Sequence, residues 1–301
     1  MSKCLVTGGA GFIGSNLVDA LVERGDEVII LDNLTTGKKE NLNPRAQFVE
    51  IDLRDLEKIK PYFIGVDYVF HCAALARVQP SIVDPVTYHD HNVNSTLNVL
   101  VASRDAKVKK VVYSASSSAY GNQTQMPLKE DMTPHPISPY ALQKYIGEEY
   151  CRLFSEVYQL PTVCLRYFNV YGPRMATNGA YACAIAIFGQ QRIKNEPMTI
   201  VGDGEQRRDN TYVGDVVRAN ILASASGVLD GTPINIGTGQ NKSVNEMAAL
   251  IGGPTVALPS RIEPRETLAD NSRARELLGW EPQMELEKWI PEYKYELGIK
   301  N

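Results

Sequence analysis

The first 32 residues contain the pattern that most constrains how this chain can fold. A short apolar run at residues 4–6 is followed by glycines at positions 8, 9, 11 and 14, and then by apolar residues at helical spacing. This order predicts a strand, a tight turn and a helix. Glycines in such a turn permit the backbone reversal and the close approach of a pyrophosphate, which binds at the positive end of the helix.

A second apolar run ends in Asp32, about 20 residues after the last of these glycines. An acidic residue at this distance hydrogen-bonds the adenine-ribose hydroxyls of a dinucleotide. Its carboxylate repels a 2′-phosphate, so the sequence predicts NAD in preference to NADP. A glycine turn is also found where nothing binds, but its place between a strand and a helix favours a dinucleotide site.

Strands and helices alternate through the first half of the chain. Further strands are predicted at 46–51, 66–71, 110–115 and 162–168, and long helices at 86–105 and 139–158. This alternation predicts an α/β fold with a doubly wound parallel Rossmann sheet, which binds ligands at the carboxyl edge of its strands. Turns become frequent after residue 170. We therefore expect an NAD-binding domain at 1–170 and a smaller, partly interleaved substrate region at 171–301, with helices near 181–194, 213–225, 243–251, 270–278 and 286–297.

Composition excludes several classes of protein. The net charge of −4 offers no basic field for nucleic acid or an acidic membrane. The N-terminus lacks a signal-peptide layout, and no apolar run approaches the ~20 residues that span a bilayer. Five cysteines without a Cys-x-x-Cys pair predict reduced thiols and a cytoplasmic location.

The histidines predict no metal site. His89 and His91 stand two residues apart, so on a helix they do not share a face, and a solvent-exposed helix start is the better interpretation. His71 at a strand end and His135 in a proline-rich loop are predicted to be structural.

A serine, a tyrosine and a lysine are spaced for proton transfer. Ser116 follows the strand predicted at 110–115, and Tyr140 and Lys144 are four residues apart, which places both on one helix face. A free phenol has a pKa of about 10. A lysine ammonium and a positively charged nicotinamide ring beside it favour the phenolate. Tyr-x-x-x-Lys alone is common on amphipathic helices, but together with the glycine turn it indicates NAD-dependent chemistry on a hydroxyl.

Three segments make the chain similar to a known family. Residues 7–14 (Thr-Gly-Gly-Ala-Gly-Phe-Ile-Gly), the serines before Tyr120, and Tyr140 with Lys144 resemble the extended short-chain dehydrogenase/reductases. Residues 165–174 and 203–209 resemble the UDP-hexose 4-epimerases, and the similarity runs from residue 3 to about residue 280. The resemblance implies that Ser116, Tyr140 and Lys144 form the catalytic set.

The glycine pattern, the ends of the predicted strands and the resemblance together give the predicted contact residues. For NAD they are Gly8, Gly11, Phe12, Ile13, Gly14, Asp32, Asn33, Asp52, Leu53, Ala73, Ala74, Tyr140, Lys144 and Tyr167. For a UDP-sugar they are Ser116, Ser117, Ser118, Tyr140, Asn169, Asn178, Thr199, Val201, Arg208, Arg261 and Thr267. The resemblance implies that Asn169 contacts a phosphate, that Arg208 and Arg261 pair with the diphosphate, and that Thr199 and Val201 flank the uracil.

The residues at 116–118 distinguish between related activities. The sugar dehydratases that resemble this chain carry Thr-Asp-Glu there, and the decarboxylases keep a glutamate in that region, whereas this chain has three serines. The serines and residues 178–182 are most similar to epimerases of N-acetylated hexosamines.

The resemblance therefore implies an NAD-dependent 4-epimerase. It would interconvert UDP-N-acetylglucosamine and UDP-N-acetylgalactosamine, and also UDP-glucose and UDP-galactose, through a 4-keto intermediate. Another nucleotide-sugar enzyme, such as a 4-reductase or an epimerase of a different sugar, and a non-catalytic NAD-sensing protein remain as alternatives.

The resemblance has two further implications. The helices at 86–105 and 139–158 lie side by side in the family, which predicts a homodimer through a four-helix bundle. The residue that closes the sugar pocket aligns with Thr267. Residues 260–265 depart from the family's Arg-x-Gly-Asp pattern, and if this loop shifts the alignment by one, Glu266 or Leu268 takes that place. A small residue there leaves room for an acetamido group.

Overall fold

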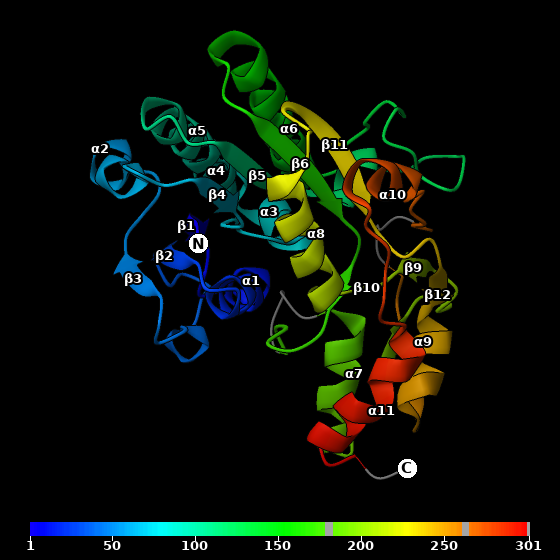
Figure 1. Ribbon diagram of the computed structural model, residues 1–301. Helices are drawn as coiled ribbons and strands as arrows, with labels where there is room; N and C mark the ends of the chain where they lie inside the picture. The colour runs from blue at the N-terminus through cyan, green and yellow to red at the C-terminus, as the bar shows by residue number, and fades with distance from the viewer. Residues whose placement is uncertain (178–182, 261–264, 300–301) are drawn as a thin grey trace.

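The computed structural model describes residues 1–177, 183–260 and 265–299. Within these residues the centre is a sheet of seven strands, all of which pair in parallel (Figure 1). Across the sheet they follow the order β11 (Asp230–Ile236), β6 (Thr162–Tyr167), β5 (Lys110–Ser116), β4 (Tyr68–His71), β1 (Lys3–Thr7), β2 (Glu27–Asp32) and β3 (Gln47–Glu50). The chain winds outward from β1 to β3 and then from β4 to β11 on the other side, so the predicted doubly wound sheet is confirmed.

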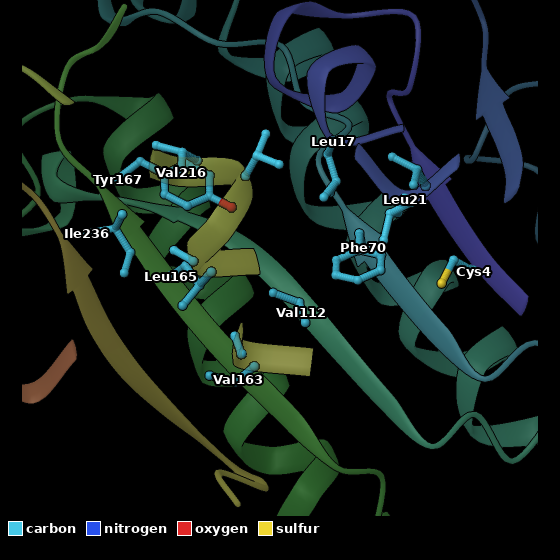
Figure 2. Close-up of a cluster of buried hydrophobic side chains, with 14 of the residues drawn as sticks. Cys4, Leu17, Leu21, Phe70, Val112, Val163, Leu165, Tyr167, Val216 and Ile236 are labelled. Atoms are coloured by element: carbon cyan, nitrogen blue, oxygen red, sulfur yellow. The ribbon is translucent and has the colours of Figure 1, made fainter. Parts of the chain in front are cut away.

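Helices cover both faces of this sheet and bury two hydrophobic clusters. One face carries α1 (Phe12–Glu23), α8 (Val213–Ala225) and α10 (Ser272–Leu278), and the other carries α2 (Leu56–Ile59), α5 (Ser95–Asp105) and α6 (Pro139–Tyr158). Cys4 of β1 packs with Leu17 and Phe70 under α1 (Figure 2), whereas the next residue, Leu5, packs under α5. Because both faces are buried, β1 is a continuous apolar run and not an alternating one.

The helix expected over 86–105 is present but contains one wider turn. α4 (Pro85–His89) leads into a π-helical turn at Asp90–Asn94, and α5 follows without a break. Asn92 in this turn is buried and hydrogen-bonds both Leu75 and Gln143. Single π turns inside helices are frequent at functional sites.

The helix predicted at 139–158 is α6, and its start is capped as its sequence suggests. Ser138 accepts a hydrogen bond from the Ala141 N–H at 3.2 Å, and Pro139 stands at the first helical position, where no donor is needed. Tyr140 and Lys144 lie in its first two turns, and the Lys144 side chain is buried against the sheet.

A buried ion pair fixes the middle of α6 to β6. Glu148 accepts from the Arg166 Nε at 3.0 Å and from its Nη2 at 2.7 Å, and neither side chain is more than 3% exposed. Arg166 also lies over the ring of Tyr120, 4.6 Å from its centroid. Removing one partner of such a pair costs about 3–5 kcal/mol, so this contact holds α6 beside the segment that follows Ser116.

The edge strand β11 was not predicted, because its sequence resembles a turn. Asp230-Gly-Thr-Pro carries a glycine at φ 77°, and the pairing with β6 shifts register between Asp230 and Pro233. Proline lacks a backbone donor, and a sheet tolerates it mainly in edge strands. β11 lies at the edge of the sheet, so no strand lies beyond it that would need a hydrogen bond from Pro233.

A third cluster forms beside the sheet from the second half of the chain. It is built by α7 (Ala184–Ile193), α9 (Val244–Ile251) and α11 (Leu286–Glu296) with β8 (Met198–Val201), which pairs with the exposed strand β13 (Thr255–Leu258). Figure 1 shows these helices together, away from the sheet. β11 and α8 also come after residue 170 yet complete the sheet, and the division of the chain at residue 170 stays a prediction.

No helix among the described residues is long and apolar enough to cross a membrane. All five cysteines are free thiols.

Candidate active site

The glycine turn between β1 and α1 depends on close backbone approaches. The Gly11 N–H donates to the Gly8 carbonyl at 3.0 Å, and a Cβ added to Gly14 would lie 2.2 Å from the same oxygen. Gly8 has φ 69°, and a Cβ there would lie 2.7 Å from backbone atoms of Ala73 at the end of β4. Side chains at these positions would push the turn out of place.

Three neighbouring residues of the predicted NAD set lie along the same turn and edge. Phe12 and Ile13 are half-buried at the start of α1, and they pack against the third and the first cluster respectively. Ala74 is half-buried beside Ala73, whose N–H donates to the Thr7 hydroxyl at 3.2 Å.

Asp32 holds the glycine turn from the end of β2. Its Oδ2 accepts from the Ala10 N–H at 3.0 Å and its Oδ1 from the Leu34 N–H at 2.8 Å. Burial raises the pKa of this carboxyl, and the two backbone donors lower it. A carboxylate has about four acceptor positions, so these bonds leave others that a ribose can use.

Asn33, Asp52 and Leu53 lie together at the neighbouring strand ends. The Asn33 Nδ2 donates to the Asp52 Oδ2 at 3.3 Å, and Leu53 is buried. Arg54 pairs with Asp52 at 2.7 Å, and its hydrogen bonds hold the pKa of that carboxyl well below its usual range. Arg54 was not predicted as part of this site, although the sequence shows a basic residue two positions after the strand-end Asp52.

The predicted catalytic residues meet at the carboxyl end of β5. Ser116 accepts from the Ser118 N–H at 3.2 Å and from the Ser118 hydroxyl at 2.9 Å, and half-buried Ser117 follows it. The Ser116 hydroxyl also lies near enough to the Tyr140 phenol to lower its pKa. The Lys144 Nζ donates to the Ser114 carbonyl at 2.8 Å. A serine, a phenol and a lysine thus lie on one edge, where a proton can pass between a substrate hydroxyl and the phenol.

One charged group near Tyr140 was not expected. Burial raises the pKa of its phenol, whereas the Ser116 hydroxyl and the Arg77 guanidinium lower it. Burial lowers the pKa of Lys144 to about 8. The sequence analysis did not predict Arg77 near the site. The sequence shows only that a basic residue follows soon after the small residues at the end of β4.

A buried polar chain lies behind this edge. The Tyr167 hydroxyl contacts Ser114 Oγ at 3.2 Å and is hydrogen-bonded to Asn220, and the Ser114 hydroxyl donates to the Cys72 sulfur at 3.3 Å. Tyr167, a predicted NAD contact, is therefore buried, and its hydroxyl is bonded inside the protein. His71 is also buried, between the hydroxyls of two threonines, and burial lowers its pKa to about 3, so it stays neutral.

Asn169 and Thr267 are brought together from distant parts of the chain. The Asn169 Nδ2 donates to the Asp209 carbonyl at 2.9 Å and to the Thr267 hydroxyl at 3.2 Å. Both amide donors are therefore in use, and a phosphate contact by this side chain would require it to rotate. The Asp209 carboxylate is fully buried and accepts from Thr238, Gly239 and Ala269, which fixes this corner of the molecule.

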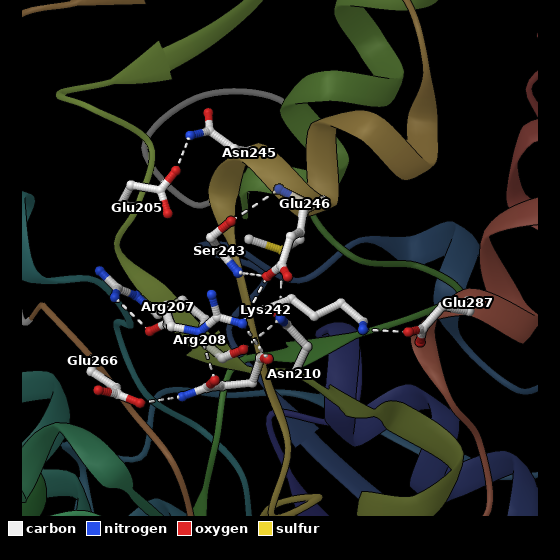
Figure 3. A network of polar contacts seen from close by, with 12 residues as sticks. Glu205, Arg207, Arg208, Asn210, Lys242, Ser243, Asn245, Glu246, Glu266 and Glu287 are labelled. Atoms are coloured by element: carbon white, nitrogen blue, oxygen red, sulfur yellow. Dashed lines mark hydrogen bonds and ion pairs between the residues drawn. The ribbon is translucent and has the colours of Figure 1, made fainter.

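Arg208 lies in a polar network on β9 (Arg207–Asp209), which pairs with β12 (Asn241–Ser243) (Figure 3). The Arg208 Nη1 donates to the Arg207 carbonyl at 2.9 Å. The Glu266 carboxylate accepts a hydrogen bond from the Asn241 Nδ2 at 2.7 Å.

The remaining predicted sugar-nucleotide contacts lie on β8 or outside the described residues. Thr199 is hydrogen-bonded to Gln191 through both its N–H and its hydroxyl, and Val201 ends β8, half-buried. Asn178 and Arg261 are outside the described residues.

Among the described residues, no group of three or more histidines, cysteines and carboxylates could hold a metal ion. His89 and His91 lie within the continuous helical stretch that begins at Pro85, not at its start.

Sequence comparison matches most of the chain to a known family model. Residues 4–237 match the model described as the NAD dependent epimerase/dehydratase family. A putative UDP-glucose 4-epimerase from Methanocaldococcus jannaschii is 43% identical over 297 residues, which cover 95% of each chain.

Solved structures show the same likeness over the whole chain. The UDP-glucose 4-epimerase of Thermotoga maritima, solved with UDP-glucose, has a TM-score of 0.93 and 42% identity, with 98% of this chain and 99% of that chain covered. The UDP-N-acetylglucosamine 4-epimerase of Methanobrevibacter ruminantium M1, in complex with UDP-N-acetylmuramic acid, has a TM-score of 0.92 and 38% identity, with 99% of both chains covered.

The glycine turn generates a direct test of the dinucleotide site. We expect Gly14→Ala to weaken NAD binding at least about tenfold, because the added Cβ would displace the Gly8 carbonyl and with it the turn. Gly227→Ala is the matched control, since its Cβ would meet nothing within 4 Å. Calorimetric titration with NAD measures both. Equal affinity of the Gly14 variant and the wild type would show that the turn does not bind the dinucleotide.

Proposed function

Because the chain belongs to the NAD dependent epimerase/dehydratase family, we propose that it interconverts UDP-N-acetylglucosamine with UDP-N-acetylgalactosamine and UDP-glucose with UDP-galactose. It is an isomerase of the UDP-sugar 4-epimerase group, and NAD is its cofactor. The observation that carries the proposal is that Ser116, Tyr140 and Lys144 come together at the end of β5, where Lys144 donates to the Ser114 carbonyl and residues 116–118 contain no carboxylate that could expel water.

The proposed reaction begins when Tyr140 takes a proton from the sugar and ends when Tyr140 returns it. The phenolate takes the proton of the sugar's 4-hydroxyl, and the neighbouring Ser116 hydroxyl would share that proton. Bound NAD supplies the acceptor and donor of a hydride at C4. Tyr140 returns the proton after the 4-keto sugar has turned its opposite face to the cofactor. Lys144, next to Ser114, would hold the nicotinamide ribose.

The UDP end must stay bound while the sugar turns. We assign this anchoring to Thr199, Val201, Arg208 and Asn169, together with Asn178 and Arg261. The buried Asp209 carboxylate fixes this corner of the molecule, and a fixed nucleotide end leaves the sugar as the part that rotates. Asn169 would turn its amide away from the Thr267 hydroxyl to reach a phosphate. Asp32 would favour NAD over NADP, because a second negative charge beside its carboxylate is repelled. Five free thiols support a cytoplasmic location.

The proposal is tested by incubating the purified protein with UDP-glucose and with UDP-N-acetylglucosamine and analysing the sugars. We expect both 4-epimers to form without net accumulation or consumption of NADH. Tyr140→Phe should lower turnover at least about 100-fold and leave UDP-sugar affinity nearly unchanged. Ser116→Ala should cost less, because the Ser118 hydroxyl lies 2.9 Å from the Ser116 oxygen.

Other outcomes would identify the alternatives. Stoichiometric consumption of NADH would indicate a 4-reductase, and NAD binding without any turnover would indicate a sensor. If Tyr140→Phe kept most of its turnover, another group would be the base.

Thr267 is our candidate for the residue that closes the sugar pocket. Its hydroxyl accepts from Asn169 at 3.2 Å and from the Asp209 N–H at 3.3 Å, and this contact with another proposed anchoring residue supports the assignment. The neighbouring Glu266 is committed to Asn241, which favours Thr267 over Glu266 for this role.

A larger side chain at this position should select between substrates. We expect Thr267→Tyr to lower kcat/KM for UDP-N-acetylglucosamine at least about tenfold relative to UDP-glucose, because a clash penalises only the acetylated sugar. Thr267→Val is the control: it keeps the size but loses the hydroxyl, so it should affect both sugars alike. An unchanged ratio in the tyrosine variant, or a wild type that rejects the acetylated sugar, would contradict the assignment.

We also propose a homodimer through the helical stretch 85–105 and α6. The two helices are joined through Gln143, which binds Asn92. α6 exposes Leu142, Leu153 and Val157 at 49%, 40% and 59%, a stripe of apolar side chains at helical spacing.

Light scattering at micromolar concentration checks this assembly. We expect a dimer mass for the wild type and a shift toward the monomer for Leu153→Glu, which places a charge in the proposed interface. Ile64→Glu changes another exposed apolar residue and should stay dimeric. A wild-type monomer would contradict the proposal.

A further inference from the structure

The Lys144 side chain on α6 is a buried cation. Only 4% of this residue is exposed, so its ammonium has lost most of its water. Its Nζ donates to the Ser114 carbonyl at 2.8 Å, which uses one of the three donors of an ammonium. A buried charge is unfavourable unless neighbouring groups stabilise it. Other groups around this ammonium must therefore contribute.

The carboxylate that the sequence places best does not pair with Lys144. Glu148 follows it by four residues, a spacing at which lysine and glutamate often form an ion pair on a helix. Both oxygens of Glu148 instead accept from Arg166, at distances from 2.7 Å to 3.1 Å. Among residues 1–177, 183–260 and 265–299, no carboxylate lies within ion-pair distance of the Lys144 Nζ.

An aromatic ring occupies the position beside the ammonium. The Lys144 Nζ lies over the ring of Tyr113 on β5, 5.0 Å from its centroid. A cation within about 6 Å of a ring centroid is attracted by the negative face of the ring, and the attraction is stronger where water is excluded. Tyr113 is buried, and its hydroxyl donates to the Lys144 carbonyl at 3.4 Å. Ring and hydroxyl thus contact the same residue.

The ring of Tyr113 is itself held by β4 and α6. The ring of His71 at the end of β4 lies 5.7 Å from it, centroid to centroid. His71 is bound to two threonine hydroxyls and stays neutral, so it adds no charge that would repel the ammonium. On α6, a Cβ added to Gly147 would lie 2.1 Å from the Tyr113 hydroxyl oxygen and 2.5 Å from its Cζ. Glycine at this position therefore permits the close approach of α6 to the ring.

We propose that Tyr113 is a positioning residue for this reaction, which holds the Lys144 ammonium over its ring and directs it to the Ser114 carbonyl and to the nicotinamide ribose. The inference rests on the proposed function only in that Lys144 contacts the cofactor. The aromatic face is the part of Tyr113 that performs this role, because it attracts the cation that no carboxylate neutralises.

The ring acts on an ammonium that is close to losing its proton. Burial lowers the pKa of Lys144 to about 8, whereas Cys72 on β4 and Glu148 and Cys151 on α6 act to raise it. Tyr113 has a pKa raised well above its usual value and stays neutral. Loss of the ring should lower the pKa of Lys144 further, because the charged form then loses its attraction to the aromatic face.

The most direct test is to titrate Lys144 in the protein saturated with NAD, by carbon NMR of lysines labelled at Cε. Lys144→Arg identifies the signal. We expect Tyr113→Leu to lower the pKa of this ammonium by about one unit and Tyr113→Phe to change it by less than about 0.3 unit, because phenylalanine keeps the ring. No shift in the leucine variant, or an equal shift in the phenylalanine variant, would overturn the inference.

Gly147→Ala tests the same contact from the helix and keeps the ring. Its Cβ must displace the ring or α6, so this variant should also lower the pKa of Lys144. Gly189→Ala on α7 is the matched control, since its Cβ would lie 2.5 Å from the Tyr293 hydroxyl in the third cluster. It should leave the pKa of Lys144 unchanged. An unshifted Lys144 in a folded Gly147 variant would contradict the proposal even if Tyr113→Leu failed to fold.

The affinity for NAD separates this role from packing alone. We expect Tyr113→Leu to weaken NAD binding about fivefold in the wild type and less than about twofold in a Lys144→Met background, because the ring acts through the ammonium. An equal loss in both backgrounds would show that the ring serves only packing, and would overturn the inference. Neither measurement needs sugar turnover, so both distinguish failure of this inference from failure of the proposed function.

Discussion

The close approach of Gly14 to the Gly8 carbonyl is the contact on which the rest of the site depends. It lets α1 start directly above β1, and the turn then lies against Ala73 at the end of β4. Asp32 ties the same turn to β2 through the Ala10 N–H. The carboxyl ends of the central strands thus form one edge, and a dinucleotide bound there would extend toward the end of β5, where the proposed catalytic hydroxyls of Ser116 and Tyr140 lie.

The features that could be predicted from sequence are those encoded within one short segment. The glycine turn, the end of β2 at Asp32 and the spacing of Tyr140 and Lys144 each depend on a few consecutive residues, and so does the capped helix that follows Ser138. Local spacing fixes which helix face a residue lies on. It does not fix which groups from other elements surround that face.

The features that were missed depend on contacts between distant segments. Asn92 in the π turn fixes the segment before Arg77, and Lys144 is directed to the Ser114 carbonyl, which the spacing could not show. Asn169 and Thr267 meet through Asp209, a buried carboxylate whose four donors come from two separate loops. β11 was hidden because a proline at a sheet edge resembles a turn.

The central claim is that hydrogen leaves C4 of the sugar and returns to C4 without exchange with water. The measurement that tests it most directly is to incubate a UDP-sugar carrying deuterium at C4 with the NAD-loaded protein in ordinary water and to analyse the epimer by mass spectrometry and NMR. The account predicts that the epimer keeps its deuterium at C4. Loss of the label to solvent, or epimerisation at another carbon, would contradict it.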